Sequence, residues 1–259
     1  MPEGPEVKIV TNWLQKVCTK AIIVNNSKFP QLNGFTITHV HCKGKQIFFH
    51  LSKDPEVVYL NSRLGMTGRW TSTEAKHTRF WMMIQTLGCA NMVIYYDDVR
   101  NFGDIEIQDQ NKYDLKLKSI GPDLLSDKID PIEWTQKLRN KRIKTKQICD
   151  FLLEQKYFSG IGNYLKSEIL YICKIKPDRQ VQSLTDNEIK LLLEVSLQVI
   201  QESYQSGGLT IKDFWSPEGY QGKYCCKVYN KSQDSNGFTV IKDTFKDGRT
   251  THWVTEIQK

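Results

Sequence analysis

The spacing of apolar residues changes from strand-like to helical at Gly121-Pro122-Asp123, and this change limits the folds available to the chain. Before that point, residues 21 to about 120 carry short alternating runs such as FTITHVH, KQIFFHL and RFWMMIQ, which are separated by glycines. Many short alternating runs between turn residues predict a β-sandwich. After it, to about residue 206, apolar residues recur at helical spacing, so the sequence predicts an α+β protein.

The two ends of the chain complete the predicted organisation. Apolar residues recur at helical spacing over 7–17, which predicts an amphipathic helix directly behind the N-terminus. In the helical part, Asp130-Pro131 opens one predicted helix, and Thr185 is a candidate N-cap for another over 186–204. The last residues contain an Asn-Gly and an Asp-Gly dipeptide, both typical of tight hairpin turns. We therefore expect three domains, which are an N-terminal β-sandwich over 1–122, a helical domain over 123–222 and a C-terminal β-hairpin over 223–259.

Charge and hydropathy restrict the partners and the compartment. The net charge is +7 and the pI is about 8.9, values that permit a polyanionic partner without proving one. No apolar run approaches the roughly 18 residues of a membrane span, and the N-terminus is polar and acidic where a signal peptide would be apolar. We expect an intracellular monomer that is neither secreted nor membrane-bound.

The N-terminal string Met-Pro-Glu-Gly-Pro-Glu places a nucleophile beside two carboxylates. If Met1 is removed, Pro2 carries a terminal secondary amine, and the reference pKa of about 7.7–8.0 for such an amine leaves it partly neutral at physiological pH. Its attack on a sugar aldehyde carbon would give a permanently cationic iminium, which is an electron sink for elimination. Glu3 and Glu6 lie where general acid–base chemistry would need them. The alternative is an ordinary helix start, since proline and glutamate are favoured in a first helical turn.

This complete N-terminal string resembles the start of the formamidopyrimidine-DNA glycosylase/endonuclease VIII family. Three further segments carry the same resemblance: 64–68 (LGMTG), 98–103 (DVRNFG) and 160–165 (GIGNYL). A lone GxG is a weak signal, whereas GIGNYL behind an apolar helix that ends in Gln is a specific one. The resemblance covers essentially the whole chain, and it implies that damaged DNA is bound between the β-sandwich and the helical domain.

The resemblance implies roles for four residues of the predicted sandwich. Lys45, in a Gly-Lys-strand context, would contact the DNA phosphate and the reacting sugar, although a lysine next to a strand is usually a solvated edge residue. Met66, Arg100 and Phe102 would fill the space left when the damaged nucleotide turns out of the duplex. Arg100 would pair with the orphaned base and Phe102 would wedge between base pairs. Without the resemblance, Met66 and Phe102 are candidates for ordinary core residues.

The resemblance also implies phosphate contacts in the C-terminal half. Gly160 and Gly162 would let the backbone approach a phosphate, and helix N-terminal amides together with Asn163 would donate to it. Arg249, in Gly-Arg-Thr-Thr behind the Asp-Gly turn, would bind the phosphates around the lesion. A basic run over 137–146 is expected either to line the DNA path or to form a solvated basic face.

The C-terminal hairpin departs from the family at its metal site. The four positions that carry cysteines in the family are Asn236, Thr239, Val254 and Ile257, and none is a good zinc ligand. The segment is similar to the zincless finger of the animal endonuclease VIII-like subgroup, in which Val254 and Ile257 would supply a small apolar contact. We therefore expect no metal and no cofactor.

Together these resemblances identify a candidate bifunctional DNA glycosylase and abasic-site lyase of base excision repair. They imply that the Pro2 nitrogen displaces the damaged base, that Glu3 moves protons at the sugar, and that β,δ-elimination follows at the iminium. Glu6 would help to position the sugar or the base. The zincless finger and a short polar stretch between Phe214 and Tyr224 favour oxidised pyrimidines and hydantoin-type lesions, in duplex or single-stranded DNA. The alternatives are an oxidised-purine glycosylase and a DNA-binding protein that has lost catalysis.

Overall fold

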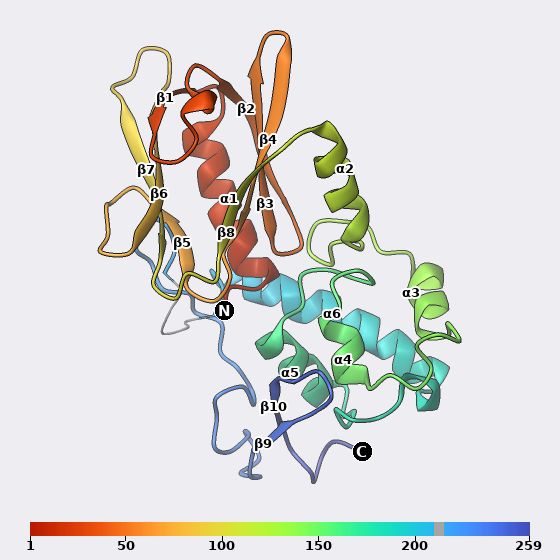
Figure 1. Ribbon diagram of the computed structural model, residues 1–259. Coiled ribbons are helices and arrows are strands. Elements are labelled where there is room, and N and C mark those ends of the chain that lie inside the picture. The colour runs from red at the N-terminus through yellow and green to blue at the C-terminus, as the bar shows by residue number, and fades with distance from the viewer. Residues whose placement is uncertain (210–214) are drawn as a thin grey trace. The chain divides into compact units, whose positions relative to one another are not determined.

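The computed structural model describes residues 1–209 and 215–259, and the chain divides into two compact units (Figure 1). Unit one comprises Met1–Ser119 and Gly207–Lys223, and unit two comprises Ile120–Ser206 and Tyr224–Lys259. The contacts thus group 207–223 with the N-terminal residues and the C-terminal hairpin with the helices. The division into three domains at 122 and 222 stays a prediction.

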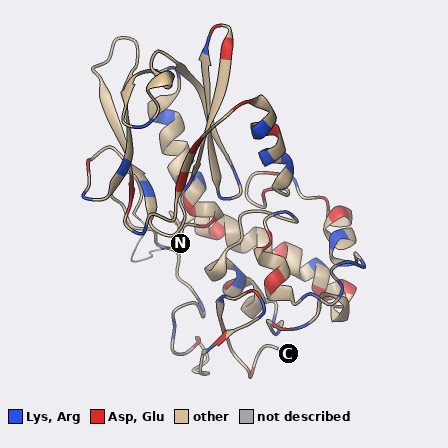
Figure 2. Cartoon of the chain, viewed as in Figure 1, with Lys and Arg blue, Asp and Glu red and all other residues tan. Residues whose placement is uncertain are grey.

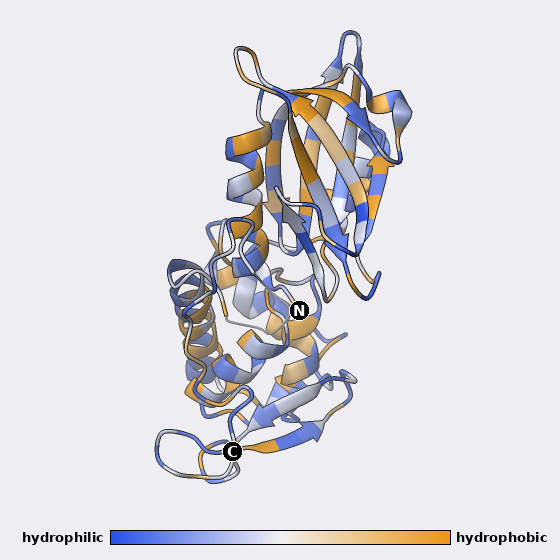
Figure 3. Ribbon diagram, turned by 90° about the vertical axis from the view of Figure 1, so that its left-hand side faces the viewer, coloured by the Kyte–Doolittle hydropathy of each residue, from blue (hydrophilic) through white to orange (hydrophobic). Residues whose placement is uncertain are grey.

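Unit one contains one antiparallel sheet of eight strands in the order β5-β7-β6-β1-β2-β3-β4-β8. The strands are β1 (Ile22–Asn26), β2 (Thr36–Lys43), β3 (Gln46–Lys53), β4 (Glu56–Arg63), β5 (Gly68–Thr71), β6 (Thr78–Gln85), β7 (Met92–Asp98) and β8 (Asp104–Gln108). Hydrophobic and hydrophilic residues alternate along them, as Figure 3 shows. β1 and β2 pair only through Ile22 and Thr36, so the sheet divides there into two halves of four strands.

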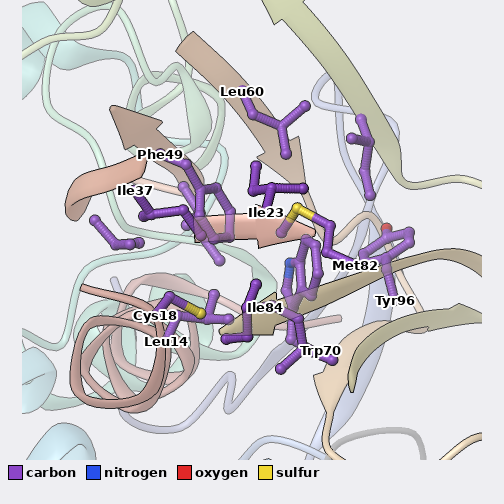
Figure 4. Close-up of a cluster of buried hydrophobic side chains, with 14 of the residues drawn as sticks. Leu14, Cys18, Ile23, Ile37, Phe49, Leu60, Trp70, Met82, Ile84 and Tyr96 are labelled. Carbon is purple, nitrogen blue, oxygen red and sulfur yellow. The ribbon is translucent and has the colours of Figure 1, made fainter. Parts of the chain in front are cut away.

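The core of unit one lies between these two halves and α1 (Gly4–Cys18) (Figure 4). Leu14 and Cys18 of α1 are fully buried in it. Phe49 of β3 and Trp70 of β5 come from different halves, and their ring centroids lie 5.4 Å apart. Burial of one large apolar side chain contributes about 1.5–3 kcal/mol, so this shared core holds helix and sheet together. The predicted N-terminal helix and β-sandwich are confirmed.

Two elements of unit one differ from the prediction. Residues up to about 120 were expected to be strands, but α2 (Gln110–Ser119) is a helix. Tyr113 is its one buried residue, so α2 lacks the apolar stripe that reveals a helix in a sequence. β5 is only four residues long, too short for an alternating pattern to be recognised.

A histidine cluster lies on the face of the sheet that α2 covers. The Tyr113 ring stacks on Tyr59 of β4, with centroids 3.8 Å apart. Its hydroxyl is 3.2 Å from His50 Nε2, and that nitrogen is 3.1 Å from His41 Nδ1. The pKa of His41 is lowered to about 4, first by burial and then by repulsion from neighbouring positive groups, among them His39.

We expect this cluster to make the unfolding free energy depend on pH between 6.5 and 4. Because the folded state favours neutral His41, its contribution is complete above the unfolded pKa of 6.5 and is lost as the pH falls towards 4. The loss should be about 1–3 kcal/mol, since the partly exposed ring is screened by solvent. Chemical denaturation at several pH values measures it. His41→Gln should flatten the profile and His77→Gln, outside the cluster, should not; a slope unchanged by His41→Gln would contradict the assignment.

Unit two begins with three short helices and one long helix. They are α3 (Pro131–Leu138), α4 (Ile148–Leu153), α5 (Asn163–Ile172) and α6 (Asp186–Gln205). Asp130 caps α3 by accepting from Ile132 N, and Thr185 caps α6 by accepting from Glu188 N, so both predicted helix starts are confirmed. Within the described part of the chain, no helix is long and apolar enough to cross a membrane.

The C-terminal hairpin belongs to the same unit. It consists of β9 (Ile241–Thr244) and β10 (Thr250–Trp253), paired antiparallel in a two-stranded sheet. Both predicted glycine turns are present, with φ of +83° at Gly237 and +68° at Gly248. These angles are costly for residues with a side chain, which explains glycine at both positions.

Candidate functional site

The N-terminal end of α1 carries the predicted nucleophile and proton-transfer residue. Pro2 is buried, and Glu3, with 2% of its surface exposed, is the N-cap residue of α1. The peptide dipoles of a helix make its N-terminus positive, which stabilises a carboxylate there. Pro2 and Glu3 can therefore begin the helix and also have the proposed catalytic roles, so the two interpretations do not exclude each other. The fold buries both Pro2 and the glutamate that follows it in the chain.

Glu6 is fully buried and its two oxygens bind two backbone amides. Oε2 accepts from Glu3 N at 2.8 Å, which closes the capping box at the start of α1. Oε1 accepts from Leu209 N at 2.8 Å. Gly208 leaves room for this contact, because a Cβ there would lie 2.8 Å from Glu6 Oε1. Glu6 thus fixes the position of Glu3, and its predicted contact with sugar or base stays a prediction.

Lys45 lies in the turn that joins β2 to β3. The strands end at Lys43 and begin again at Gln46, so Gly44 and Lys45 form a two-residue hairpin turn. Gly44 has a φ of +57°, which this tight connection requires. Lys45 is half-buried and not a fully solvated edge residue.

Two adjoining loops bring the three predicted void-filling residues together. Met66 lies between β4 and β5, and Arg100 and Phe102 lie between β7 and β8. Arg100 Nη1 lies 3.7 Å from Met66 Sδ. The loops touch at Gly65, where an added Cβ would lie 2.6 Å from the Phe102 carbonyl. Phe102 is 56% exposed, so the alternative of a buried strand residue is wrong for it.

Asp98, a fully buried residue that the sequence analysis did not single out, organises these loops. Its Oδ1 accepts from Thr67 Oγ1 of the first loop. In the second loop, Oδ1 accepts from Arg100 N at 3.3 Å and Oδ2 accepts from Gly103 N at 2.7 Å. A carboxylate with several donors is a strong acceptor, and its removal would take the Asp98 acceptor from Gly103 N, whereas Arg100 N would keep its bond to Thr67 Oγ1 at 3.0 Å. In the sequence, the only indication of this role is that Asp98 lies two positions before Arg100.

In unit two, a turn precedes α5 and is folded around one glutamine. Gln155 Oε1 accepts from Gly160 N at 3.1 Å, and its Nε2 donates to Ile161 O at 2.9 Å. Gly160 has a φ of +106°, so a residue with a side chain would be strained there. Gly162, the N-cap of α5, has an extended φ of −126°, which does not require glycine.

The hairpin tip lies beside the start of α5. Asn163 Nδ2 donates to Thr250 O at 2.8 Å. The neighbouring Arg249 is exposed, and its backbone N donates to Asp247 Oδ1 at 2.9 Å. Unit two thus brings Asn163 and Arg249, 86 positions apart in the sequence, to one place.

The basic run over 137–146 is partly used inside unit two. Lys137 donates to Tyr157 O at 2.8 Å and pairs with Glu133. Other paired bases are Arg139 with Asp186, and Lys146 with Asp150 and Glu154. Figure 2 shows acidic residues close to basic ones along the helices of unit two. The bases of the run that are exposed and belong to none of these ion pairs are Lys141, Arg142 and Lys144, so acidic residues of unit two pair with the other three.

Comparisons with known proteins match the whole length of this architecture. Residues 1–105 match the model described as formamidopyrimidine-DNA glycosylase N-terminal domain, and residues 120–214 match its H2TH domain. The chain is 32% identical over 240 residues to formamidopyrimidine-DNA glycosylase of Prochlorococcus marinus, covering 90% of this chain and 73% of the relative. It is 30% identical to that of Lactococcus lactis subsp. cremoris, covering 98% and 97%. A crystal structure of a Lactococcus lactis variant with Fapy-dG DNA gives a TM-score of 0.87 at 28% identity, covering 100% of both chains.

The chain belongs to the formamidopyrimidine-DNA glycosylase family. Members of this family are DNA glycosylases with abasic-site lyase activity, so the protein is a bifunctional enzyme of base excision repair that acts on damaged DNA. The family assignment made from the N-terminal string and GIGNYL is confirmed.

The residues at the family's zinc positions do not fit a metal. Val254 is fully buried in an apolar cluster with Tyr171, Val228 and Val240, and Ile257 packs against it. Among the described residues, no group of three or more potential His, Cys, Asp or Glu ligands could hold a metal ion. An apolar cluster therefore occupies the place of a zinc site, as predicted for Val254 and Ile257.

We expect alanine at Met66, Arg100 and Phe102 to reduce turnover of a lesion in duplex DNA far more than in single-stranded DNA. Unstacking a nucleotide from a duplex costs a few kcal/mol, so the loss on duplex should be about 100-fold, with less than about threefold on a single strand. Single-turnover kinetics on both substrates measure it. Val99→Ala is the matched control, because Val99 is 54% exposed in the same loop. Equal losses on both substrates would mean that the three residues act in folding alone.

Proposed function

We propose that this enzyme removes oxidised purines of the formamidopyrimidine type and cleaves the resulting abasic site. The observation that carries the proposal is the full-length similarity to the Lactococcus lactis enzyme in its complex with Fapy-dG DNA. Relatives that match 98% and 100% of this chain are also named formamidopyrimidine-DNA glycosylase. This substrate class was the alternative in the sequence analysis, and the comparisons favour it over oxidised pyrimidines.

The proposed chemistry begins at Pro2. Its neutral nitrogen attacks the anomeric carbon, the N-glycosidic electron pair leaves with the base, and the base takes up the proton that the Pro2 nitrogen loses. Glu3 supplies a second proton to the ring oxygen as the sugar ring opens. The product is an iminium between Pro2 and the sugar. Loss of a proton from the adjacent carbon then expels the 3′ phosphate, and a second elimination expels the 5′ phosphate. Lys45, Asn163 and Arg249 bind the phosphates during these steps.

A second candidate substrate class is oxidised pyrimidines. The hairpin, whose residues at the expected zinc positions are poor zinc ligands, supports it through the resemblance to the zincless subgroup. A Lactococcus lactis complex with DNA that contains an oxidised pyrimidine also matches this chain, with a TM-score of 0.85 at 28% identity. The short polar stretch remains a weaker argument, because Phe214 at its start lies outside the described residues.

A panel of lesion-bearing oligonucleotides tests the proposal. Fapy-dG, an oxidised pyrimidine and a ready-made abasic site are each placed in the same duplex and in the same single strand. We expect kcat/KM for Fapy-dG to exceed that for the oxidised pyrimidine by about tenfold or more, which is 1.4 kcal/mol of transition-state discrimination. The reverse order would establish the second candidate. Failure of borohydride to trap a covalent complex on any substrate would instead support a DNA-binding protein without catalysis.

A further inference from the structure

A buried ion pair joins α5 to the C-terminal hairpin. Lys166 Nζ lies 2.5 Å from Asp247 Oδ2, and the two side chains are 0% and 1% exposed. Both charged side chains are thus shielded from solvent. Removing one partner of a buried ion pair leaves an uncompensated charge and strongly destabilises the folded protein. Lys166 and Asp247 therefore determine each other's position.

The same aspartate binds the hairpin tip through its second oxygen. Asp247 Oδ1 accepts from Arg249 N at 2.9 Å, so the carboxylate that Lys166 fixes also fixes the backbone of Arg249. Asn163, three positions before Lys166 on α5, donates to the carbonyl of Thr250. Two side chains of one helix thus reach the residues on either side of Arg249.

Other contacts attach the rest of the hairpin to α5 without Lys166. Ser167 Oγ accepts from His252 N at 3.3 Å. Glu168 accepts from the backbone N–H groups of Lys227, Val228 and Tyr229. Loss of the Lys166 charge should therefore disturb the hairpin tip and leave most of the attachment intact.

We propose that Lys166 is a positioning residue for DNA binding, which acts by fixing Asp247 and through it the arginine at the hairpin tip. The ion pair supplies the rigidity that a metal gives to a zinc finger. This inference rests on the proposed function, in which Arg249 binds a backbone phosphate. A correctly placed charge-assisted hydrogen bond is stronger than one that must first be ordered, because ordering a long side chain costs entropy.

A double-mutant cycle tests the proposal in a Glu3→Gln background, which is expected not to remove the base from the lesion duplex. The variants are Lys166→Met, Arg249→Ala and the two together, and affinity for one lesion duplex is measured at several salt concentrations. We expect Arg249→Ala to weaken binding by about tenfold, the scale of one charged hydrogen bond, and to lower the salt slope by about 0.9. Lys166→Met should weaken binding by a similar factor, and the double variant should bind no more weakly than Arg249→Ala alone.

Three comparisons separate the outcomes. Lys190→Met on α6 removes the same charge from unit two at an exposed position, and it should change the affinity by less than about twofold. Independent, multiplicative effects of Lys166→Met and Arg249→Ala, or no effect of Lys166→Met, would overturn the inference alone. No effect of Arg249→Ala would overturn the phosphate role in the proposed function as well.

A second variant covers the case in which Lys166→Met fails to fold. Asp247→Asn keeps an Oδ1 acceptor for Arg249 N but removes the charge that Lys166 requires. Thermal unfolding reports the stability of each variant separately from its DNA affinity. Folded Asp247→Asn protein with unchanged affinity and salt slope would equally overturn the inference.

Discussion

Protein that retains Met1, or carries any N-terminal extension, should form no borohydride-trapped complex with a DNA strand that contains an abasic site. In such protein the Pro2 nitrogen is an amide, which has no lone pair available for attack on the sugar carbon. Both base removal and strand cleavage should fall by about 10⁴-fold or more, the scale of losing a covalent nucleophile. Mass spectrometry of the N-terminus together with gel analysis of trapped DNA measures this.

Binding is the control for that experiment. The extended protein should retain its fold, because the buried residues of α1 that face the sheet are unchanged. Pro2→Gly keeps a terminal amine but forms an imine that can lose its proton, so it should retain a small part of the activity. Full trapping by protein whose Met1 is shown to be present would eliminate Pro2 as the nucleophile.

Glu3→Gln should stop base removal and leave most of the lyase activity on a ready-made abasic site. General acid–base catalysis contributes about 10²–10⁴-fold, and base removal needs the sugar ring to be protonated as it opens. The lyase step starts from a sugar that is already open for part of the time, so its rate should fall by no more than about tenfold. Gln keeps an oxygen at the N-cap of α1, which limits the effect on the helix.

Glu56→Gln is the matched control, since Glu56 is an exposed carboxylate at the start of β4 in the same unit. It should leave both activities unchanged. The two reactions are compared on the same oligonucleotide sequence, once with the damaged base and once without it. If Glu3→Gln reduced both by the same factor, Glu3 would have no specific part in removing the base.

The sequence could predict most of the fold because its elements have local signals. The capping residues Asp130 and Thr185, the glycine turns and the periodicity of α1 all depend on neighbours within a few positions. α2 was missed because its stability comes from one ring, Tyr113, packed on Tyr59 of another element. Propensity and pattern cannot reveal a helix that depends on one distant contact.

The candidate site likewise contains residues that the sequence could indicate and residues that it could not. Pro2, Met66 and Arg249 could be proposed because each lies in a short motif. Asp98 could not, because its role exists only once the loops between β4 and β5 and between β7 and β8 adjoin. Lys166 and Asp247 lie 81 positions apart, and a sequence alone does not indicate which charges are buried together.

The two contacts of Glu6 set an order of events during synthesis. Glu3 N is available as soon as α1 leaves the ribosome, whereas Leu209 N, 203 positions after Glu6, emerges much later in translation. Pro2 is buried in the finished fold. The initiator methionine is therefore most accessible to an aminopeptidase on the nascent chain, before Leu209 completes the surroundings of the N-terminus. In the proposed chemistry the Pro2 amine can thus be released before Glu6 acquires its contact with Leu209.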